Sequence, residues 1–295
     1  MKALNKQWYD SCLIWILIYA GNISNALESV GLIHNVNPEK SQRQVINQQG
    51  INKYDEQFLK WFIGFSEGDG SFVITGGKSL FSIHLHLVDL PLLYTIKTNL
   101  NMGNVYTLNN SCILIIKAKN EIYKLIQIFN GNIYLNKRKL LFVNWVDNFN
   151  RKNKLDIKIL NTKFKPSLFD SWLAGFIDAE GSFLVSVSKK KIIQRFVLGQ
   201  KYAETEFIYL SFLLNGYTEK LKGNDRLVIN FKKLNVLIQY LKYHKLISIK
   251  EKSLEKWLEI YDIRINQKSP LDKEHYNLVK TKASLINSLR KTIKL

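Results

Sequence analysis

Residues 61–72, WFIGFSEGDGSF, and residues 172–183, WLAGFIDAEGSF, decide the fold. Each stretch is an apolar, helix-like run with small residues on one stripe, followed by an acid, a glycine and a β-like segment. The two acids, Asp69 and Glu180, are separated by the length of a whole subdomain, so the chain is predicted to consist of two similar halves. Each half would deliver one carboxylate to a shared place.

The small residues of both stretches favour close packing of two helices. Gly64 and Gly68 lie on one face of the first helix, and Ala174 and Gly175 supply a similar face in the second. Small residues let two helix backbones approach each other, as in paired membrane helices. We therefore expect the two runs to pack against each other along these faces.

Each acid is expected at the C-terminal end of its helix, followed by a glycine, Gly70 or Gly181, in the left-handed conformation of a helix cap. A carboxylate at this end of a helix is electrostatically unfavourable, because the negative end of the dipole lies there. A divalent cation is the natural compensation, since two converging carboxylates offer oxygen ligands to a hard ion such as Mg2+. Asp69 and Glu180 are therefore the predicted metal ligands.

At these residues the chain resembles the LAGLIDADG homing endonucleases, in the single-chain form with two motifs. Residues 173–181 match the signature nearly letter for letter, with Glu180 in place of its last aspartate. Residues 62–70 match it more loosely, with Ser66 and Glu67 in the middle. The resemblance covers roughly residues 55–265 and implies an α+β fold. Two pseudo-symmetric αββαββα subdomains would place their antiparallel sheets as a DNA-binding saddle.

The composition agrees with a polyanionic partner. The 295 residues carry a formal net charge of +19, and 46% are hydrophobic, which suits a globular core. Two cysteines, Cys12 and Cys112, exclude a Cys-rich zinc site and a disulfide framework. The abundance of Lys, Asn, Ile and Leu is typical of an AT-rich coding sequence, as in organellar genomes, so we expect a mitochondrial protein, with the chloroplast as the alternative.

The repeat also predicts the domain organisation, because the order of helices and strands recurs in both halves and Trp145 and Trp257 occupy matching places. The N-terminal part contains an apolar run at residues 12–20 that is too short to span a bilayer; it is a buried helix, an interfacial segment or part of a leader. The predicted parts are an N-terminal extension and linker (1–54), a first subdomain (55–150), a basic linker (151–165), a second subdomain (166–265) and a basic helical tail (266–295).

Strands of the second half carry several basic and amide side chains. A ribbon of such strands could lie in the major groove of duplex DNA. The predicted DNA-binding residues are Lys189, Lys191, Gln194, Lys220, Lys222, Arg226 and Lys232.

The resemblance implies hydrolysis of both DNA strands, with Mg2+ or another divalent cation such as Mn2+ held by Asp69 and Glu180. It further implies a basic residue near the start of the last helix of each half. Lys137 and Lys250 are the best matches, and Arg138 competes with Lys137.

The resemblance also implies a polar residue at the end of the second strand of each half. Gln200 fits this place in the second half. The first half departs from the pattern, because Leu85 or His86 stands near the corresponding place. Equal activity of the two sites is therefore in doubt.

Three functions remain open. The first is a double-strand DNA endonuclease that acts as a monomer, because one chain holds both motifs, and that needs no small-molecule cofactor. The second is an intron maturase of the same fold, with intron RNA as its partner. The third is a DNA-binding regulator with an inactive nuclease fold, although such a protein would be expected to lose an acid, and this chain keeps both Asp69 and Glu180.

Overall fold

The computed structural model describes residues 54–188, 191–266 and 272–286. The chain divides into two units, residues 1–53 and 54–295, and every described residue belongs to the second. The predicted apolar run at residues 12–20, the predicted DNA contact at Lys189 and residues 287–295 of the predicted tail lie outside the described residues. In the described ranges no helix has the length and apolar character needed to cross a membrane.

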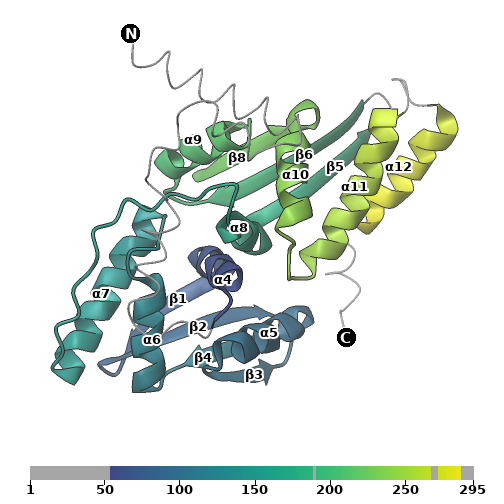
Figure 1. Ribbon diagram of the computed structural model, residues 1–295. Helices are drawn as coiled ribbons and strands as arrows, with labels where there is room; N and C mark the ends of the chain where they lie inside the picture. Colours follow the sequence, from purple (N-terminus) through teal and green to yellow (C-terminus); the bar gives the residue numbers. More distant parts are fainter. Residues whose placement is uncertain (1–53, 189–190, 267–271, 287–295) are drawn as a thin grey trace, which may run out of the picture. The chain divides into compact units, whose positions relative to one another are not determined.

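The first half is an alternation of helices and antiparallel strands, as predicted (Figure 1). Its elements are α4 (Glu56–Asp69), β1 (Gly70–Thr75), β2 (Lys78–His86), η1 (Leu87–Asp89), α5 (Leu90–Leu100), β3 (Asn104–Leu108), β4 (Ser111–Ile116), α6 (Lys119–Phe129) and α7 (Asn136–Asn153).

The second half repeats this order and adds one helix. Its elements are α8 (Trp172–Glu180), β5 (Gly181–Ser188), β6 (Lys191–Gln200), α9 (Glu204–Leu213), β7 (Tyr217–Leu221), β8 (Asn224–Asn230), η2 (Phe231–Lys233), α10 (Asn235–Tyr243), α11 (Lys250–Asn266) and α12 (Lys273–Leu285). The α+β fold of two pseudo-symmetric halves is therefore confirmed. Each repeat ends in two helices, one more than the αββαββα pattern.

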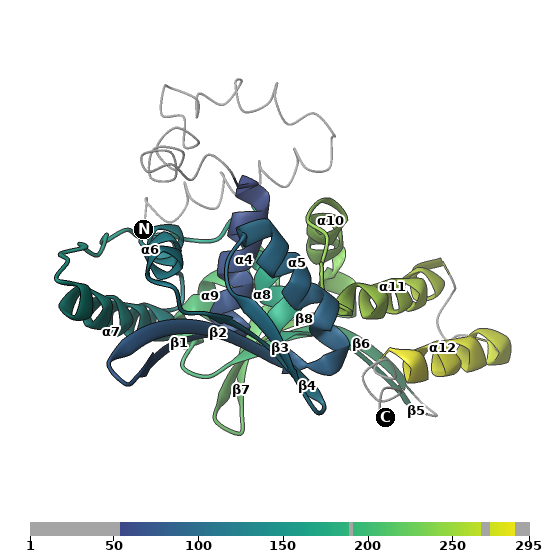
Figure 2. The same cartoon turned by 90° about the horizontal axis from the view of Figure 1, so that it is seen from below.

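Each half builds one antiparallel sheet of four strands. The strand orders are β1-β2-β4-β3 and β5-β6-β8-β7, so the same topology occurs twice. The registers agree as well, because Gly70 pairs with Ile83 in the first sheet and Gly181 pairs with Leu198 in the second. In each half the helices pack on one side of the sheet (Figure 2). The opposite side of the inner strands is not covered by a helix in the described part of the chain.

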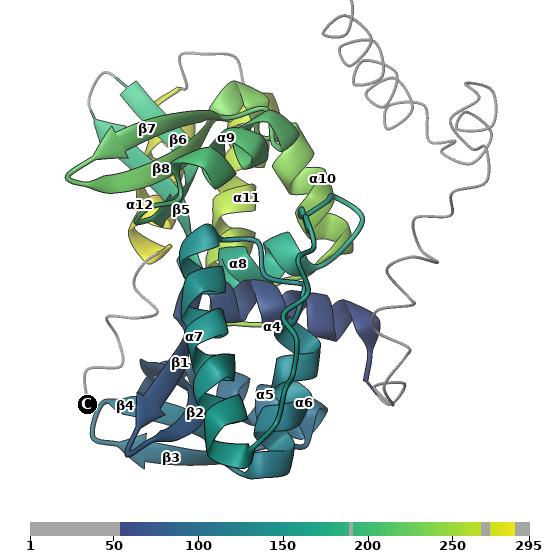
Figure 3. The same ribbon diagram turned by 90° about the vertical axis from the view of Figure 1, so that its left-hand side faces the viewer.

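The two halves meet through α4 and α8, which lie side by side (Figure 3). A Cβ atom added to Gly64 would lie 1.9 Å from the carbonyl oxygen of Trp172, and one added to Gly175 would lie 1.9 Å from that of Trp61. Only glycine permits this approach, since the neighbouring atoms are backbone atoms. The close helix pair predicted from the small residues is confirmed.

The conformation predicted for the glycines after the two acids is wrong. Gly70 (φ −77°, ψ 153°) and Gly181 (φ −70°, ψ 143°) are extended, because the chain passes from the helix directly into a strand. Space rather than backbone freedom selects glycine here. A Cβ atom would lie 2.6 Å from the carbonyl oxygen of Ser66 at Gly70, and 2.6 Å from that of Ile177 at Gly181.

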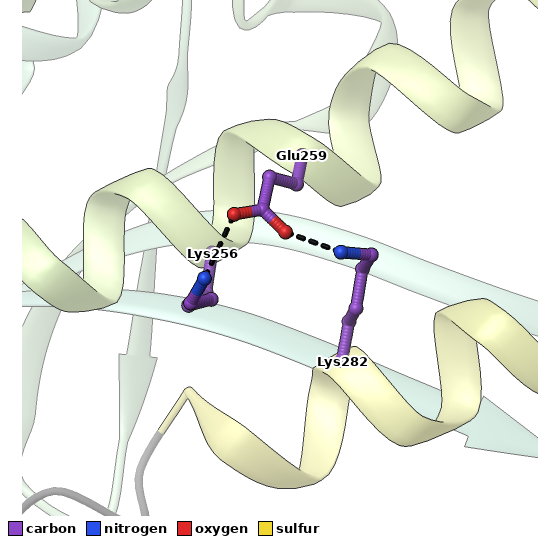
Figure 4. Close-up of polar contacts among 3 residues, drawn as sticks. All are labelled: Lys256, Glu259 and Lys282. Carbon is purple, nitrogen blue, oxygen red and sulfur yellow. Dashed lines mark hydrogen bonds and ion pairs between the residues drawn. The ribbon is translucent and has the colours of Figure 1, made fainter.

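Helix α12 is the described part of the predicted basic tail, and it packs on the second half. Val279 of α12 and Ile286, which follows the helix, are buried. The Glu259 carboxylate on α11 accepts from Lys256 Nζ at 2.9 Å and also from Lys282 of α12, so it joins the two helices (Figure 4).

Candidate active site

The two predicted metal ligands end the paired helices, so α4 and α8 bring them to one place. Asp69 is the last residue of α4 and Glu180 the last residue of α8. Burial raises the pKa of the Glu180 carboxyl above its usual range, and the nearby charge of Asp69 raises it further. Lys250, Arg138 and Gln200 act in the opposite direction. Both carboxylates therefore share one electrostatic environment with two cations.

Lys250, the first residue of α11, lies at the C-terminal end of α8. Its Nζ donates to the carbonyl oxygens of Ala179 at 2.7 Å and Ile177 at 3.2 Å. A cation at this end of a helix offsets the negative pole of the dipole. Part of the compensation that the sequence suggested for a metal ion is thus supplied by a lysine.

Arg138 of α7 has the corresponding place in the first half. Its Nε donates to the Glu67 carbonyl oxygen at 2.6 Å, its Nη1 to Gly70 O at 2.9 Å, and its Nη2 to Gly68 O, all at the end of α4. The Nζ of Lys137, the residue predicted for this position, instead lies 4.9 Å from the ring centroid of Tyr202. Arg138 is therefore the geometric counterpart of Lys250, and a catalytic role for Lys137 stays a prediction.

Gln200 ends β6 beside Glu180, as predicted. Its Nε2 donates to Glu180 Oε1 at 3.1 Å. Ile83 and Leu198 occupy equivalent positions in the two sheets. Leu85, two residues after Ile83, is therefore equivalent to Gln200, two residues after Leu198. An aliphatic side chain cannot donate this hydrogen bond, so the surroundings of Asp69 and Glu180 differ.

Two further acids of the site were missed from sequence. Glu67 and Asp178 are 2% exposed, and each is a hydrogen-bond acceptor for a tryptophan of the other half. Burial raises the pKa of Glu67 to about 7, although the hydrogen bonds that this carboxylate accepts act to lower it. A signal was present, because both motifs carry an acid two positions before the metal-ligand candidate. Their role is to fix the helices that carry Asp69 and Glu180.

We call the side of each sheet that faces away from the helices its open face. Side chains alternate along each strand: in β6, Gln194 and Phe196 are buried beneath the helices, whereas Lys191 is exposed and Arg195 half-buried on the open face. On β8, Arg226 lies on the open face, where its Nη1 is 3.2 Å from Glu219 Oε1. The open faces are the surfaces available to a duplex.

The prediction that Gln194 contacts DNA is wrong. It is 2% exposed, and its Nε2 donates to the Trp257 carbonyl oxygen at 2.8 Å. Arg264 Nη1 donates to its Oε1 at 3.3 Å. Gln194 therefore joins β6 to α11 and cannot reach a base, because its side chain lies on the covered face.

The other predicted DNA-binding residues are distributed over different places. Lys191 and Arg226 lie on the open face, and Lys222 lies in the turn between β7 and β8 with φ 52°. Lys220 points away from the open face, and its Nζ is 3.5 Å from Asp225 Oδ1. Lys232 falls in η2 and not in a strand. Their contacts with DNA stay predictions.

The donor set suits a hard cation that is shared with a substrate. The described residues hold no group of three or more His, Cys, Asp or Glu side chains able to bind a metal ion. Asp69 and Glu180 supply carboxylate oxygens of the kind that Mg2+ prefers, and Mg2+ commonly completes its shell with water and phosphate oxygens. The mutual repulsion that raises the pKa of Glu180 is what a bound cation would relieve.

Fold and site together define a class: a pseudo-symmetric α+β protein with two acids on paired helices above two antiparallel sheets. The family model described as LAGLIDADG endonuclease matches residues 62–149 and 173–261. The chain belongs to this family. It is also similar in fold to the LAGLIDADG homing endonuclease I-GzeII, solved in complex with its DNA target (TM-score 0.68, 21% identity, 78% of this chain and 99% of that chain).

Curated relatives point the same way. The chain is 35% identical over 235 residues to probable intron-encoded endonuclease 4 of Neurospora crassa, covering 76% of this chain and 43% of the relative. It is 30% identical over 244 residues to the intron-encoded RNA maturase bI4 of Saccharomyces cerevisiae (76% and 36%). It is 28% identical to the uncharacterized mitochondrial protein RF1 of the same yeast (55% and 40%). The chain thus spans less than half the length of these relatives.

Proposed function

We propose that this protein is a site-specific endonuclease that cuts both strands of a DNA target and is encoded in an intron. One observation carries the proposal: α4 and α8 bring two carboxylates, Asp69 and Glu180, into one electrostatic environment between two sheets with open faces. Relatives named as intron-encoded endonucleases and a neighbour solved with its DNA target support it.

The chain's own residues have distinct parts in this chemistry. Asp69 and Glu180 would hold divalent cations, Mg2+ or Mn2+, which supply charge neutralisation and an activated water at the scissile phosphates. Arg138 and Lys250 fix the ends of the two helices and add positive charge beside the acids. Gln200 orients the Glu180 carboxylate through its hydrogen bond.

We further propose that one chain binds one duplex, because both acids come from the same polypeptide. With a net charge of +19, phosphate contacts would dominate affinity. Affinity should then fall by about 0.9 log units per log unit of salt for each phosphate neutralised. The similarity to a mitochondrial protein supports a mitochondrial location.

A second function, assistance in intron splicing, rests on the similarity to an RNA maturase. Retention of both acids favours the nuclease, because a protein that acts only on RNA has no need for them. The two functions are separable by offering the full chain the exon-junction DNA and the intron RNA in parallel.

The deciding experiment compares the wild type with Asp69→Asn and Glu180→Gln on exon-junction DNA. Each substitution removes a charge and preserves shape, so binding should persist while at least one strand is no longer cut. Lys124→Gln, which removes a charge from the exposed side of α6 and touches no residue assigned to the site, is the control and should cut both strands. Cleavage of both strands by the Asp69→Asn/Glu180→Gln double variant would exclude the assignment.

A further inference from the structure

The two open faces carry opposite chemistry at matched positions. Gly70 pairs with Ile83 and Gly181 with Leu198, which fixes the correspondence between the two sheets. Counting back along β2 and β6 by the same number of residues, Leu80 in the first sheet matches Arg195 in the second.

A second matched position shows the same difference. Ile83 pairs with Leu114, and Leu198 pairs with Leu227. The residues that precede these partners, Ile113 on β4 and Arg226 on β8, therefore correspond. An aliphatic side chain in the first half again stands where the second half has an arginine.

All four residues lie on inner strands and are half-buried. β2 and β4 are the inner strands of the first sheet, and β6 and β8 those of the second. In a sheet lying along a groove, inner strands face the base edges, whereas edge strands and hairpin tips face the phosphates. These four side chains are therefore placed to contact bases; they are Leu80, Ile113, Arg195 and Arg226.

The surroundings of Arg226 favour a base over a phosphate. Its Nη1 is 3.2 Å from Glu219 Oε1 on the neighbouring strand, which orients the guanidinium and offsets part of its charge. On the other side it pairs with Gly199, where an added Cβ would meet no atom within 4 Å. An oriented, partly neutralised guanidinium with open space beside it is a weak phosphate ligand, but it keeps N–H groups for neutral acceptors.

Arg195 is presented differently. It stands between Leu184 and Asn230 in the register, and the described part of the chain gives it no ion pair. Its side chain is half-buried on the open face. An arginine without an ion pair there keeps the paired donors that fit the two acceptors of guanine, O6 and N7.

We propose that the target is asymmetric at these two positions: guanines face Arg195 and Arg226, and thymine methyl groups face Leu80 and Ile113. Arginine is the usual partner of guanine in the major groove, and apolar side chains contact the C5-methyl group of thymine. The half-site under the second sheet is then read by hydrogen bonds and the half-site under the first by apolar contact. This inference rests on the proposed function, because it assumes that the open faces bind duplex DNA.

The test is binding selection from a duplex library randomised around the exon junction, with the full chain and no divalent cation. The variants Arg226→Lys and Arg195→Lys keep the positive charge but remove the bidentate fork. Each should reduce the preference for guanine at one position of one half-site by about 5- to 150-fold. Binding averaged over all sequences should change little, and Lys222→Gln, in the turn between β7 and β8, should weaken all sequences alike.

The reciprocal variant Ile113→Arg should create a guanine preference at the symmetry-related position of the other half-site. If the lysine variants keep the base preference of the wild type, the arginines contact phosphates and the inference is overturned. If the wild type selects no sequence at all, the proposed function fails instead, and the inference fails with it. Circular dichroism of each variant shows whether the fold is kept. Ile113→Arg is an independent test, because a variant that fails to fold cannot gain a base preference.

Discussion

The indole of Trp61 in the first half donates its N–H to Asp178 Oδ2 of the second half at 2.8 Å, and Trp172 donates to Glu67 Oε1 at 2.8 Å in return. The pseudo-twofold symmetry of the two halves relates these two bonds. Each acid also accepts from two backbone N–H groups just before the helix that carries Arg138 or Lys250.

This arrangement couples the helix pair to the cations of the site. Glu67 receives the N–H groups of Tyr134 at 2.9 Å and Leu135 at 2.6 Å, immediately before α7. Asp178 receives those of Ile247 at 2.8 Å and Ser248 at 3.2 Å, immediately before α11. The buried acids therefore position the basic side chains relative to the metal-ligand candidates.

Trp61→Phe should lower the free energy of unfolding by about 1–3 kcal/mol, because it leaves a buried carboxylate with one donor fewer. Trp172→Phe should act in the same way through Glu67. Urea unfolding of the two single variants and the double variant measures both bonds and their coupling. A change below about 0.5 kcal/mol in both single variants would show that the pair is not structural.

Gly64→Ala should destabilise the protein by about 3 kcal/mol, since the new methyl group would lie 1.9 Å from a backbone oxygen of α8 and overpacking of this kind is costly. The helices would have to separate, and cleavage should fall with stability. Gly199→Ala is a matched control, because its added Cβ would meet no atom within 4 Å. Thermal unfolding that ranks the two variants equally would contradict the close approach.

The sequence predicted well whatever depends on periodicity and repetition. The two acids, the glycine-mediated helix pair and the matched tryptophans follow from one pattern that occurs twice. Trp145 and Trp257 indeed make matching contacts, each accepting at its carbonyl oxygen from an inner strand residue, Ser79 or Gln194.

The sequence-based predictions are wrong where the role of a residue depends on the direction in which its side chain points. Gln194 alternates with Arg195 along β6, and a shift of one residue exchanges the covered and the open face. Lys137 and Arg138 are neighbours on a helix, so they point about 100° apart, and sequence alone does not say which one meets α4. A glycine that follows a helix usually takes the left-handed cap, but here the β-like segment begins at the glycine itself, so Gly70 and Gly181 are extended.

Arg138→Ala should reduce cleavage of both strands by about 100-fold, because its charge acts on both Asp69 and Glu180 and its guanidinium holds the end of α4. Lys137→Ala should leave single-turnover cleavage close to that of the wild type, since its amine lies over the Tyr202 ring. Single-turnover rates with labelled duplex measure both. The opposite order would restore Lys137 to the role first predicted for it.

Glu259→Gln should weaken the attachment of α12 by less than about 1 kcal/mol, because the ion pairs it removes are partly exposed to solvent. The hydrogen bonds from Lys282 and Lys256 lower the pKa of Glu259 below its ordinary value of 4.5. The contribution of the Glu259 carboxylate to the free energy of unfolding is therefore present above pH 4.5 and is lost as the pH falls through the lowered pKa. Unfolding at pH 7 and near pH 3 should show a difference between the two proteins only at the higher pH.

Gln200→Leu places beside Glu180 the residue type that the first half has at the matching position, Leu85, and its effect should be specific to one strand. Gln200 donates to Glu180 at 3.1 Å, whereas Leu85 at the matching position donates nothing to its neighbour. Loss of a hydrogen bond that orients a metal ligand typically costs about 10- to 100-fold in activity. The wild type should therefore cut one strand before the other and accumulate a nicked duplex, and Gln200→Leu should slow the strand that is cut first.

Duplexes labelled on each strand in turn resolve the two rates, and Leu85→Gln provides the reciprocal variant. Equal slowing of both strands by Gln200→Leu would mean that the hydrogen bond supports the common helix pair and not one carboxylate.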